Sequence, residues 1–256
     1  MNGPFLQKPI VSYWKSSDPC DKLDILSSKL TEINIIRTKN LTDEFIKFCL
    51  TNKSRIYLHI VINGMGHTVL EPNIPTVKQM FYGIKNLIDN GFSQKQILVV
   101  VEPIIPNDNG LKALQLLLRI FTEFKPLRLR FIRFQLLSYT QIDGKFIIAN
   151  RNITKRQTTN GILHYLIKTP DFYSKYYKLI DEYKSIISVD SNEEALIGVR
   201  ELMAFGINNS WQNSDGSTEK IINYEKGNKF KPIVNVISSN PATRCSRRCL
   251  LCPFRF

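Results

Sequence analysis

The stretch ILVVV at residues 97–101 decides the fold class. It is apolar throughout and rich in β-branched side chains, which predicts a strand buried on both faces of a parallel sheet. A second run, RIYLHIVI at 55–62, is also rich in apolar residues and stops at Gly64. Between the two runs, apolar residues recur at helical spacing over 77–88, and Gly91 ends that pattern. The order strand, helix, strand predicts a βαβ unit.

The same alternation continues on both sides of this unit. Further strands are predicted at 11–14, 33–36, 129–136, 186–189 and 233–237, and further helices at 111–121, 172–183 and 196–203. Six or seven strands that alternate with helices favour the α/β class and a parallel (β/α) barrel of the TIM type, complete or partial. We expect a single domain over 1–256, with an excursion at 138–170, a loop at 207–230 and a C-terminal cysteine loop at 238–256.

The chain is strongly basic, with a formal net charge of +13 at pH 7. Such a charge suggests an anionic partner, namely nucleic acid, a nucleotide or an acidic protein, and the alternative is a basic enzyme without such a partner. Residues 125–156 hold eight basic residues and one acid, Asp143, with aromatic residues between them. This segment is either a nucleic-acid surface or a solvated face beside a buried strand.

The chain carries no secretory signal pattern at its N-terminus and no apolar run long enough to span a bilayer. Its five cysteines are an odd number, and three of them are bunched together. This is a poor disulfide framework and fits a reducing compartment. We therefore expect a cytoplasmic protein with no membrane partner.

Three cysteines close the chain at a C-x3-C-x2-C spacing: Cys245, Cys249 and Cys252. Three adjacent thiolates can converge on one metal centre, and soft sulfur ligands select zinc, copper(I) or an iron–sulfur cluster. The positive charge of neighbouring arginines, Arg247 among them, lowers thiol pKa values and offsets an anionic cluster. A zinc site would need a fourth protein ligand in addition to the three cysteines. The remaining interpretation, besides a cluster or zinc, is three free cysteines in a basic tail. The candidate fourth ligands for zinc are Cys20, Cys49, His59, His67 and His164.

The cysteine spacing resembles the cluster motif of the radical S-adenosylmethionine (radical SAM) enzymes. In that family three cysteines hold a [4Fe-4S] cluster, and the fourth iron binds the amino and carboxylate groups of S-adenosylmethionine. Reductive cleavage then gives methionine and a 5′-deoxyadenosyl radical, which abstracts a hydrogen atom from the substrate. Two features depart from the family pattern. Leu251 stands where an aromatic residue is common, and the motif lies at the C-terminus instead of after the first barrel strand.

The middle of the chain resembles a group of bacterial proteins that carry this cysteine cluster at the C-terminal end. The resemblance covers roughly 33–105 and the tail, and it implies an architecture and a cofactor class but no substrate. A strand at 233–237 followed by the cysteines has the same local order as the radical SAM cluster loop, so the chain would be a circular permutation of that order. The matching stretches are Thr38-Lys39-Asn40, Gly64-Met65-Gly66, Glu71-Pro72-Asn73-Ile74-Pro75 and Pro103.

Ligands of parallel α/β proteins bind at the carboxyl ends of the strands, so residues at those ends are the site candidates. The candidates for catalysis are Lys39, Glu102, Gln135 and Asp190. The candidates for contact with S-adenosylmethionine are Asn63, Gly64, Gly66 and Glu102, since glycine permits close backbone approach. A tight turn at the two glycines and a pairing of Glu102 with a lysine are the structural alternatives.

The leading hypothesis is a radical SAM enzyme that acts on an unknown substrate, with a lean towards a nucleotide or nucleic acid. It needs S-adenosylmethionine, a [4Fe-4S] cluster and an electron donor that the sequence does not identify. The first alternative is a non-enzymatic nucleic-acid-binding protein with a zinc-stabilised basic tail. The second is a radical SAM relative that has lost its activity.

Overall fold

A computed structural model gives the fold of this chain. The structure describes residues 11–15, 18–68, 70–102, 104–105, 108–123, 128–131, 153–159, 162–167, 171–185, 187–189, 210–212, 218–220, 234–238, 247 and 249.

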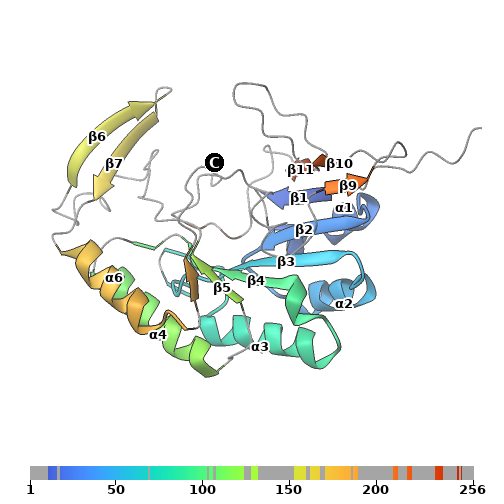
Figure 1. Cartoon of the computed structure of the whole chain (residues 1–256), viewed down its shortest axis with the longest axis horizontal. Helices are drawn as coiled ribbons and strands as arrows, with labels where there is room; N and C mark the ends of the chain where they lie inside the picture. The colour runs from blue at the N-terminus through green and yellow to red at the C-terminus, as the bar shows by residue number, and fades with distance from the viewer. Residues whose placement is uncertain are drawn as a thin grey trace, which may run out of the picture.

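One parallel sheet of seven strands organises the protein (Figure 1). Its spatial order is β11-β1-β2-β3-β4-β5-β8, and every neighbouring pair is parallel. The last strand in sequence therefore lies beside the first, and Val11 is in register with Val234. The strands are β1 (Val11–Lys15), β2 (Ile33–Thr38), β3 (Ile56–Val61), β4 (Ile97–Val100), β5 (Arg128–Phe131), β8 (Ile187–Val189) and β11 (Val234–Ser238).

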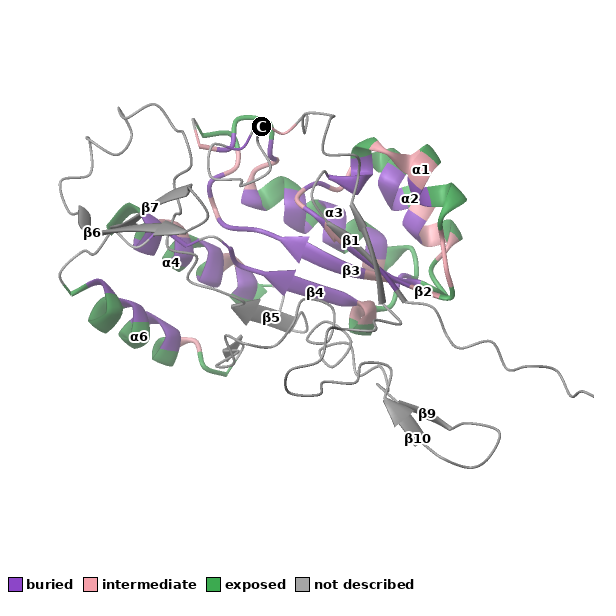
Figure 2. Cartoon of the chain, turned by 90° about the horizontal axis from the view of Figure 1, so that it is seen from above, coloured by how far each residue is buried: buried purple, intermediate pink, exposed green. Residues whose placement is uncertain are grey.

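Helices cover one face of this sheet and form the main core with it (Figure 2). Ile36, Ile60 and Val99 of the sheet share one apolar cluster with Phe81 of α3 and Leu118 of α4. α3 begins with a capping box, in which the Thr76 and Gln79 side chains and backbone amides satisfy one another. The helices are α1 (Leu23–Ser28), α2 (Asp43–Thr51), α3 (Val77–Asp89), α4 (Asp108–Glu123) and α6 (Phe172–Glu182), with short 3-10 turns η1 (Pro19–Asp21) and η2 (Gln94–Gln96).

The opposite face of the central strands is buried as well. Ile35, His59, Val61, Leu98 and Val100 are each at most 2% exposed, although they lie outside the helix-packed cluster. Burial on both faces explains why β4 is apolar along its whole length. The prediction made from 97–101 is confirmed.

The predicted strands at 11–14, 33–36, 55–62, 97–101, 129–136, 186–189 and 233–237 are each present over most or part of their range. The helices predicted at 77–88, 111–121 and 172–183 are present as α3, α4 and α6, whereas the helix predicted at 196–203 lies outside the described residues. The helix α2 was not predicted from the sequence, although Thr42 caps it and Phe45, Ile46 and Cys49 bury one face.

Two antiparallel hairpins stand apart from the large sheet. The first, β6 (Ile153–Thr159) with β7 (Ile162–Ile167), lies in the predicted excursion. The second, β9 (Ser210–Gln212) with β10 (Thr218–Lys220), lies within the loop predicted at 207–230 and was not itself predicted. Short polar runs around Trp211 carry too little periodicity to reveal such strands.

The mixed α/β class and the parallel sheet are confirmed, and the described pairings leave β11 and β8 at the two ends of the sheet. Closure into a barrel stays a prediction. None of the helices in the described ranges combines the length and the apolar character needed to cross a membrane.

Candidate active site

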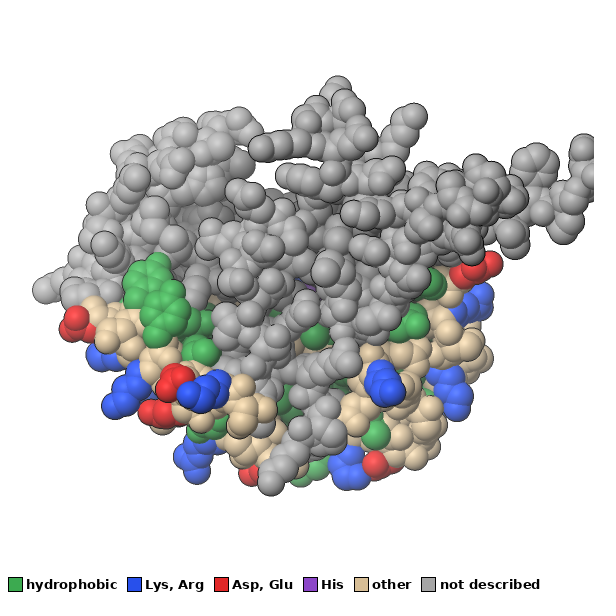
Figure 3. Space-filling model, viewed as in Figure 1, with side chains coloured by type: hydrophobic (Ala, Val, Ile, Leu, Met, Phe, Trp, Pro, Cys, Tyr) green, Lys and Arg blue, Asp and Glu red, His purple; other side chains and the backbone are tan. Residues whose placement is uncertain are grey.

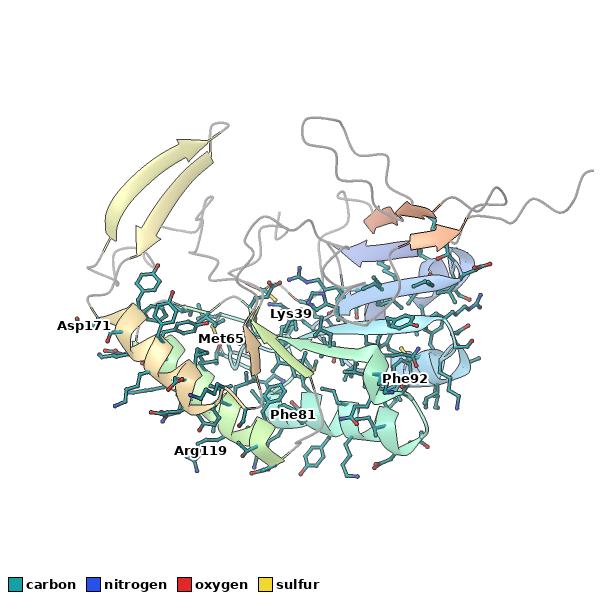
Figure 4. The ribbon with its side chains drawn as sticks, viewed as in Figure 1. Lys39, Met65, Phe81, Phe92, Arg119 and Asp171 are labelled. Carbon is teal, nitrogen blue, oxygen red and sulfur yellow. The ribbon has the colours of Figure 1, made fainter. Side chains whose placement is uncertain are left out.

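The loops that follow β1, β2 and β3 meet at the carboxyl edge of the sheet. Because the strands are parallel, each of them delivers its following loop to this edge. Figure 4 shows Lys39, from the loop after β2, and Met65, from the loop after β3, near the arrowhead ends of the strands. The polar and charged residues of these three loops form the candidate site.

Asp18, in the loop after β1, is the first organising residue of this edge. It is 7% exposed, and its Oδ1 accepts hydrogen bonds from the Thr38 hydroxyl at 2.6 Å and the Cys20 amide at 3.2 Å. Its Oδ2 accepts a bond from the Lys39 amide at 3.0 Å. Burial raises the pKa of Asp18, while the Arg247 guanidinium and these hydrogen bonds act in the opposite direction. One carboxylate thus ties the loop after β1 to the loop after β2.

Arg247, which stands inside the cysteine motif, reaches the same carboxylate. Its Nε lies 3.7 Å from Asp18 Oδ2, and its Nη2 lies 2.5 Å from Asp21 Oδ1. Its Nη1 also donates to the Asn73 carbonyl oxygen at 3.4 Å, in the loop after β3. The arginine side chain is only 13% exposed, and Cys249, two residues further on, is 5% exposed. The tail therefore meets the carboxyl edge of the sheet at this arginine.

A buried carboxylate occupies the centre of the loop after β3. Glu71 is fully buried, forms an ion pair with Lys39 Nζ, and accepts a hydrogen bond from Asn63 Nδ2 at 2.9 Å, both through Oε1. Its Oε2 has no hydrogen-bond partner among the described residues. Two predicted site residues, Lys39 and Asn63, are thus brought together by a third, Glu71, for which the sequence predicted no role.

The loop after β3 is tightly built around its glycines. Gly64 has φ of +82°, in the left-handed region that favours glycine. A Cβ on Gly66 would lie 2.0 Å from the Pro75 carbonyl oxygen, so no larger residue fits there without a shift of the backbone. Asn63 Oδ1 accepts a hydrogen bond from the Met65 amide at 3.0 Å. The tight-turn alternative for these two glycines is therefore realised in the structure.

A cavity of about 220 Å³ opens beside this loop. Its lining is mostly apolar, and Asn63 and Gly64 belong to it. The loop after β3 also contributes Met65, Thr68 and Leu70, and the rest of the lining comes from the loop after β4 and the first turns of α4. Two of the residues predicted to contact a cofactor therefore border a partly open cavity at the carboxyl edge.

Glu102, after β4, forms an ion pair with Arg37 of β2. The carboxylate is 7% exposed and the guanidinium 31% exposed. The sequence had suggested a lysine as the partner of Glu102, and the structure gives Arg37 instead. Local sequence does not show that β2 and β4 lie on either side of β3, which is what brings these two residues together. His59, in register with Arg37, is buried within β3, whereas His67 is exposed.

Several predicted site residues cannot be placed. Gln135, Asp190, Cys245 and Cys252 lie outside the described residues, and so does the candidate zinc ligand His164. Within the described ranges, no group of three or more histidine, cysteine or acidic residues is arranged to hold a metal ion. Of the cysteines, Cys49 is buried in α2, and Cys20 donates its thiol hydrogen to the Asn40 carbonyl at 2.7 Å.

The donor set of the tail fits an iron–sulfur cluster in its chemistry. Three thiols at short spacing provide soft ligands, and iron–sulfur clusters are held by cysteine thiolates. Burial of Cys249 and the cationic Arg247 beside it suit an anionic cluster shielded from water.

The described helical surface carries mixed charges. Figure 3 shows lysine and arginine groups interspersed with acidic groups over this face, together with one hydrophobic patch over α6. The exposed tyrosines of α6 are Tyr173 and Tyr177, which are 38% and 62% exposed. The basic segment 125–156 lies mostly outside the described residues, so the nucleic-acid surface predicted there stays a prediction.

No protein-family model and no curated protein matches this sequence. Among solved structures, a mutant of spore photoproduct lyase aligns with a TM-score of 0.42 and 12% identity, over 66% of this chain and 54% of that chain. Spore photoproduct lyase complexed with dinucleoside spore photoproduct aligns with a TM-score of 0.41 and 13% identity, over 61% and 50%. This chain spans about half the length of the structures that it matches. A likeness this remote assigns neither a fold family nor an activity to this chain.

Proposed function

We propose that this protein is a radical SAM-type enzyme whose [4Fe-4S] cluster is held by Cys245, Cys249 and Cys252. The observation that carries the proposal is the position of Arg247. This arginine lies between the first two cysteines of the motif, and its guanidinium is bound at the carboxyl edge of a parallel sheet, by Asp18 and Asp21. Ligand sites of parallel α/β proteins lie at that edge.

The strand order supports a permuted form of the radical SAM arrangement. β11 pairs in parallel with β1, so the chain that leaves β11 emerges at the same edge as the loops after β1, β2 and β3. The cysteine loop therefore follows an edge strand next to β1, although it comes last in the chain. We infer a partial barrel, within a single domain over 1–256, in which β11 occupies the position of the strand that precedes the cluster.

With cluster and S-adenosylmethionine bound, the chemistry supplied is reductive cleavage to methionine and a 5′-deoxyadenosyl radical, which takes a hydrogen atom from the substrate. The chain itself binds and orients. Asn63 and Gly64 border the cavity and would contact the cofactor, with Gly66 fixing the turn beside them. Glu71 would hold the Lys39 ammonium and the Asn63 amide in place, because it contacts both from a fully buried position.

Lys39 remains the best supported of the predicted catalytic residues, since its side chain is 22% exposed at the carboxyl edge. Glu102 is held by Arg37 and would act as a hydrogen-bond acceptor for a ribose or amino group. Gln135 and Asp190 are retained as proposed members of the site from their positions after predicted strands. A net charge of +13 favours a nucleotide or nucleic acid as the substrate.

The test is anaerobic reconstitution with iron and sulfide, followed by iron and sulfide analysis and EPR spectroscopy with and without S-adenosylmethionine. We expect about four irons per chain and an EPR signal that changes when S-adenosylmethionine is added. A variant with Cys245, Cys249 and Cys252 all replaced by alanine should lose both.

The matched control is Cys49→Ala, which removes a thiol buried in α2 and should keep the cluster. One tightly bound zinc in the wild-type protein, or no metal, would refute the proposal and favour the nucleic-acid-binding alternative. A cluster whose spectrum ignores S-adenosylmethionine would indicate a relative without the activity.

A further inference from the structure

The guanidinium of Arg247 joins the cysteine loop to two other loops at once. It contacts carboxylates of Asp18 and Asp21, after β1, and the backbone carbonyl of Asn73, after β3. These contacts bridge more than 170 residues of sequence. An arginine fork that binds several acceptors in fixed directions restricts orientation as well as position.

One acceptor of this arginine, the Asp18 carboxylate, is itself held in place. Asp18 is 7% exposed and is held by the Thr38 hydroxyl and the amides of Cys20 and Lys39. Asp18 caps the 3-10 turn η1, and Asp21 is the last residue of that turn. Asp18 is therefore a preformed acceptor, and it loses little conformational entropy when the arginine binds.

We propose that Arg247 is a positioning residue that fastens the cysteine loop to the carboxyl edge through Asp18 and Asp21. This inference rests on the proposed function, since it assigns the placement of the metal-binding loop to a residue that is not a metal ligand. The contact with Asp18 also connects the tail to the Lys39 amide, so the cysteine loop and the loop after β2 share one anchor.

Two physical accounts of Arg247 make different predictions. If it acted only as a positive charge near the thiolates, Arg247→Lys would behave like the wild type. If it acts by positioning, lysine fails, because a single ammonium cannot reproduce the hydrogen bonds of two guanidinium nitrogens to Asp21 and the Asn73 carbonyl while a third nitrogen lies 3.7 Å from Asp18.

The first experiment uses the full chain without metal, under reducing conditions. The labelling rate of Cys249 by a thiol reagent is measured by mass spectrometry of its peptide, in the wild type and in Arg247→Gln. Because Cys249 is 5% exposed, its labelling requires the loop to open. We expect roughly a tenfold or greater increase in the variant, the size typical of losing hydrogen bonds between charged groups. The labelling rate of Cys249 should also rise above the wild-type rate in Arg247→Lys.

The matched control is Arg119→Gln, which removes an arginine exposed on α4 and labelled in Figure 4. It should label at the wild-type rate. A charge exchange, Arg247→Asp with Asp21→Arg, should recover part of the protection that Arg247→Asp alone loses. Wild-type labelling of Cys249 in Arg247→Gln, or a charge exchange that labels as fast as the single variant, would overturn the inference. Circular dichroism melting shows whether each variant is still folded. If Arg247→Gln has unfolded, the charge exchange decides whether the contact between Arg247 and Asp21 protects Cys249.

The second experiment uses the reconstituted protein, with iron content and the cluster midpoint potential as readouts. Arg247→Gln should bind less iron or shift the potential, whereas Arg119→Gln should change neither. If the wild type binds no cluster, the proposed function fails while the labelling result still decides whether Arg247 fastens the tail. If the wild type binds a cluster and both Arg247 readouts match the control, the positioning role fails alone.

Discussion

Replacement of Lys39 by methionine tests whether the buried Glu71 needs its cation. Glu71 is fully buried, and its Oε1 is shared by the Lys39 ammonium and the Asn63 amide. Methionine keeps most of the apolar stem and removes the charge. Glu71 is then left as a buried carboxylate without the Lys39 ammonium. A buried charge that has lost its partner lowers the free energy of unfolding strongly.

The expected loss is about 3 kcal/mol of unfolding free energy, at the lower end for a broken buried pair, since Lys39 itself is 22% exposed. In a Glu71→Gln background the same replacement removes no charge partner, so about 1 kcal/mol is expected for the hydrogen bond. The difference of about 2 kcal/mol is the coupling energy of the pair. Urea unfolding followed by circular dichroism measures all four proteins of the cycle.

The matched control is Lys85→Met, which breaks an ion pair with Asp89 in which both side chains are 55% exposed. Solvent screens such a pair, and about 0.5 kcal/mol or less is expected. A loss of unfolding free energy in Lys39→Met no larger than in Lys85→Met would show that Glu71 does not need its cation. The same conclusion would follow if Lys39→Met cost the same, within about 0.5 kcal/mol, in both Glu71 backgrounds.

Two further outcomes are expected. Gly66→Ala should lower the unfolding free energy by about 1–3 kcal/mol, because the new Cβ would lie 2.0 Å from the Pro75 carbonyl oxygen and the loop must move; an unchanged melting temperature would contradict this. Cys20 and Cys49 should resist alkylation in the folded protein at pH 8. Burial raises the pKa of both thiols, so little of the reactive thiolate is present at that pH. Rapid labelling of either peptide in protein shown to be folded would contradict the burial.

The large elements could be predicted because each carries its own periodic signal. β4 is apolar throughout since both faces are buried, and α3 shows helical spacing between Thr76 and Gly91. α2 also carried a signal, with Thr42 as its cap and two acids in its first turn, but its nine residues gave a short pattern. The strands β6, β9 and β10 were not predicted, because short polar strands hardly differ from loops in sequence. β7 is apolar along most of its length and was not predicted either.

The site was predicted less completely, because its residues acquire their partners through the fold. Lys39 and Asn63 were identified from their positions after strands, whereas the roles of Asp18 and Glu71 were not. An acid in a loop is usually solvated, and nothing local marks Glu71 as fully buried.

Periodicity and spacing are local properties, so the α/β class, the places of the seven strands and the cysteine spacing of the tail follow from the amino-acid sequence alone. The pairing of β11 with β1, the contacts of Glu71 with Lys39 and Asn63, and the contact of Arg247 with Asp18 depend on the folded chain. Parallel strands bring the loops after them to one edge, and the order of the strands there is set by packing between distant segments. Local sequence specifies each strand but not its neighbour.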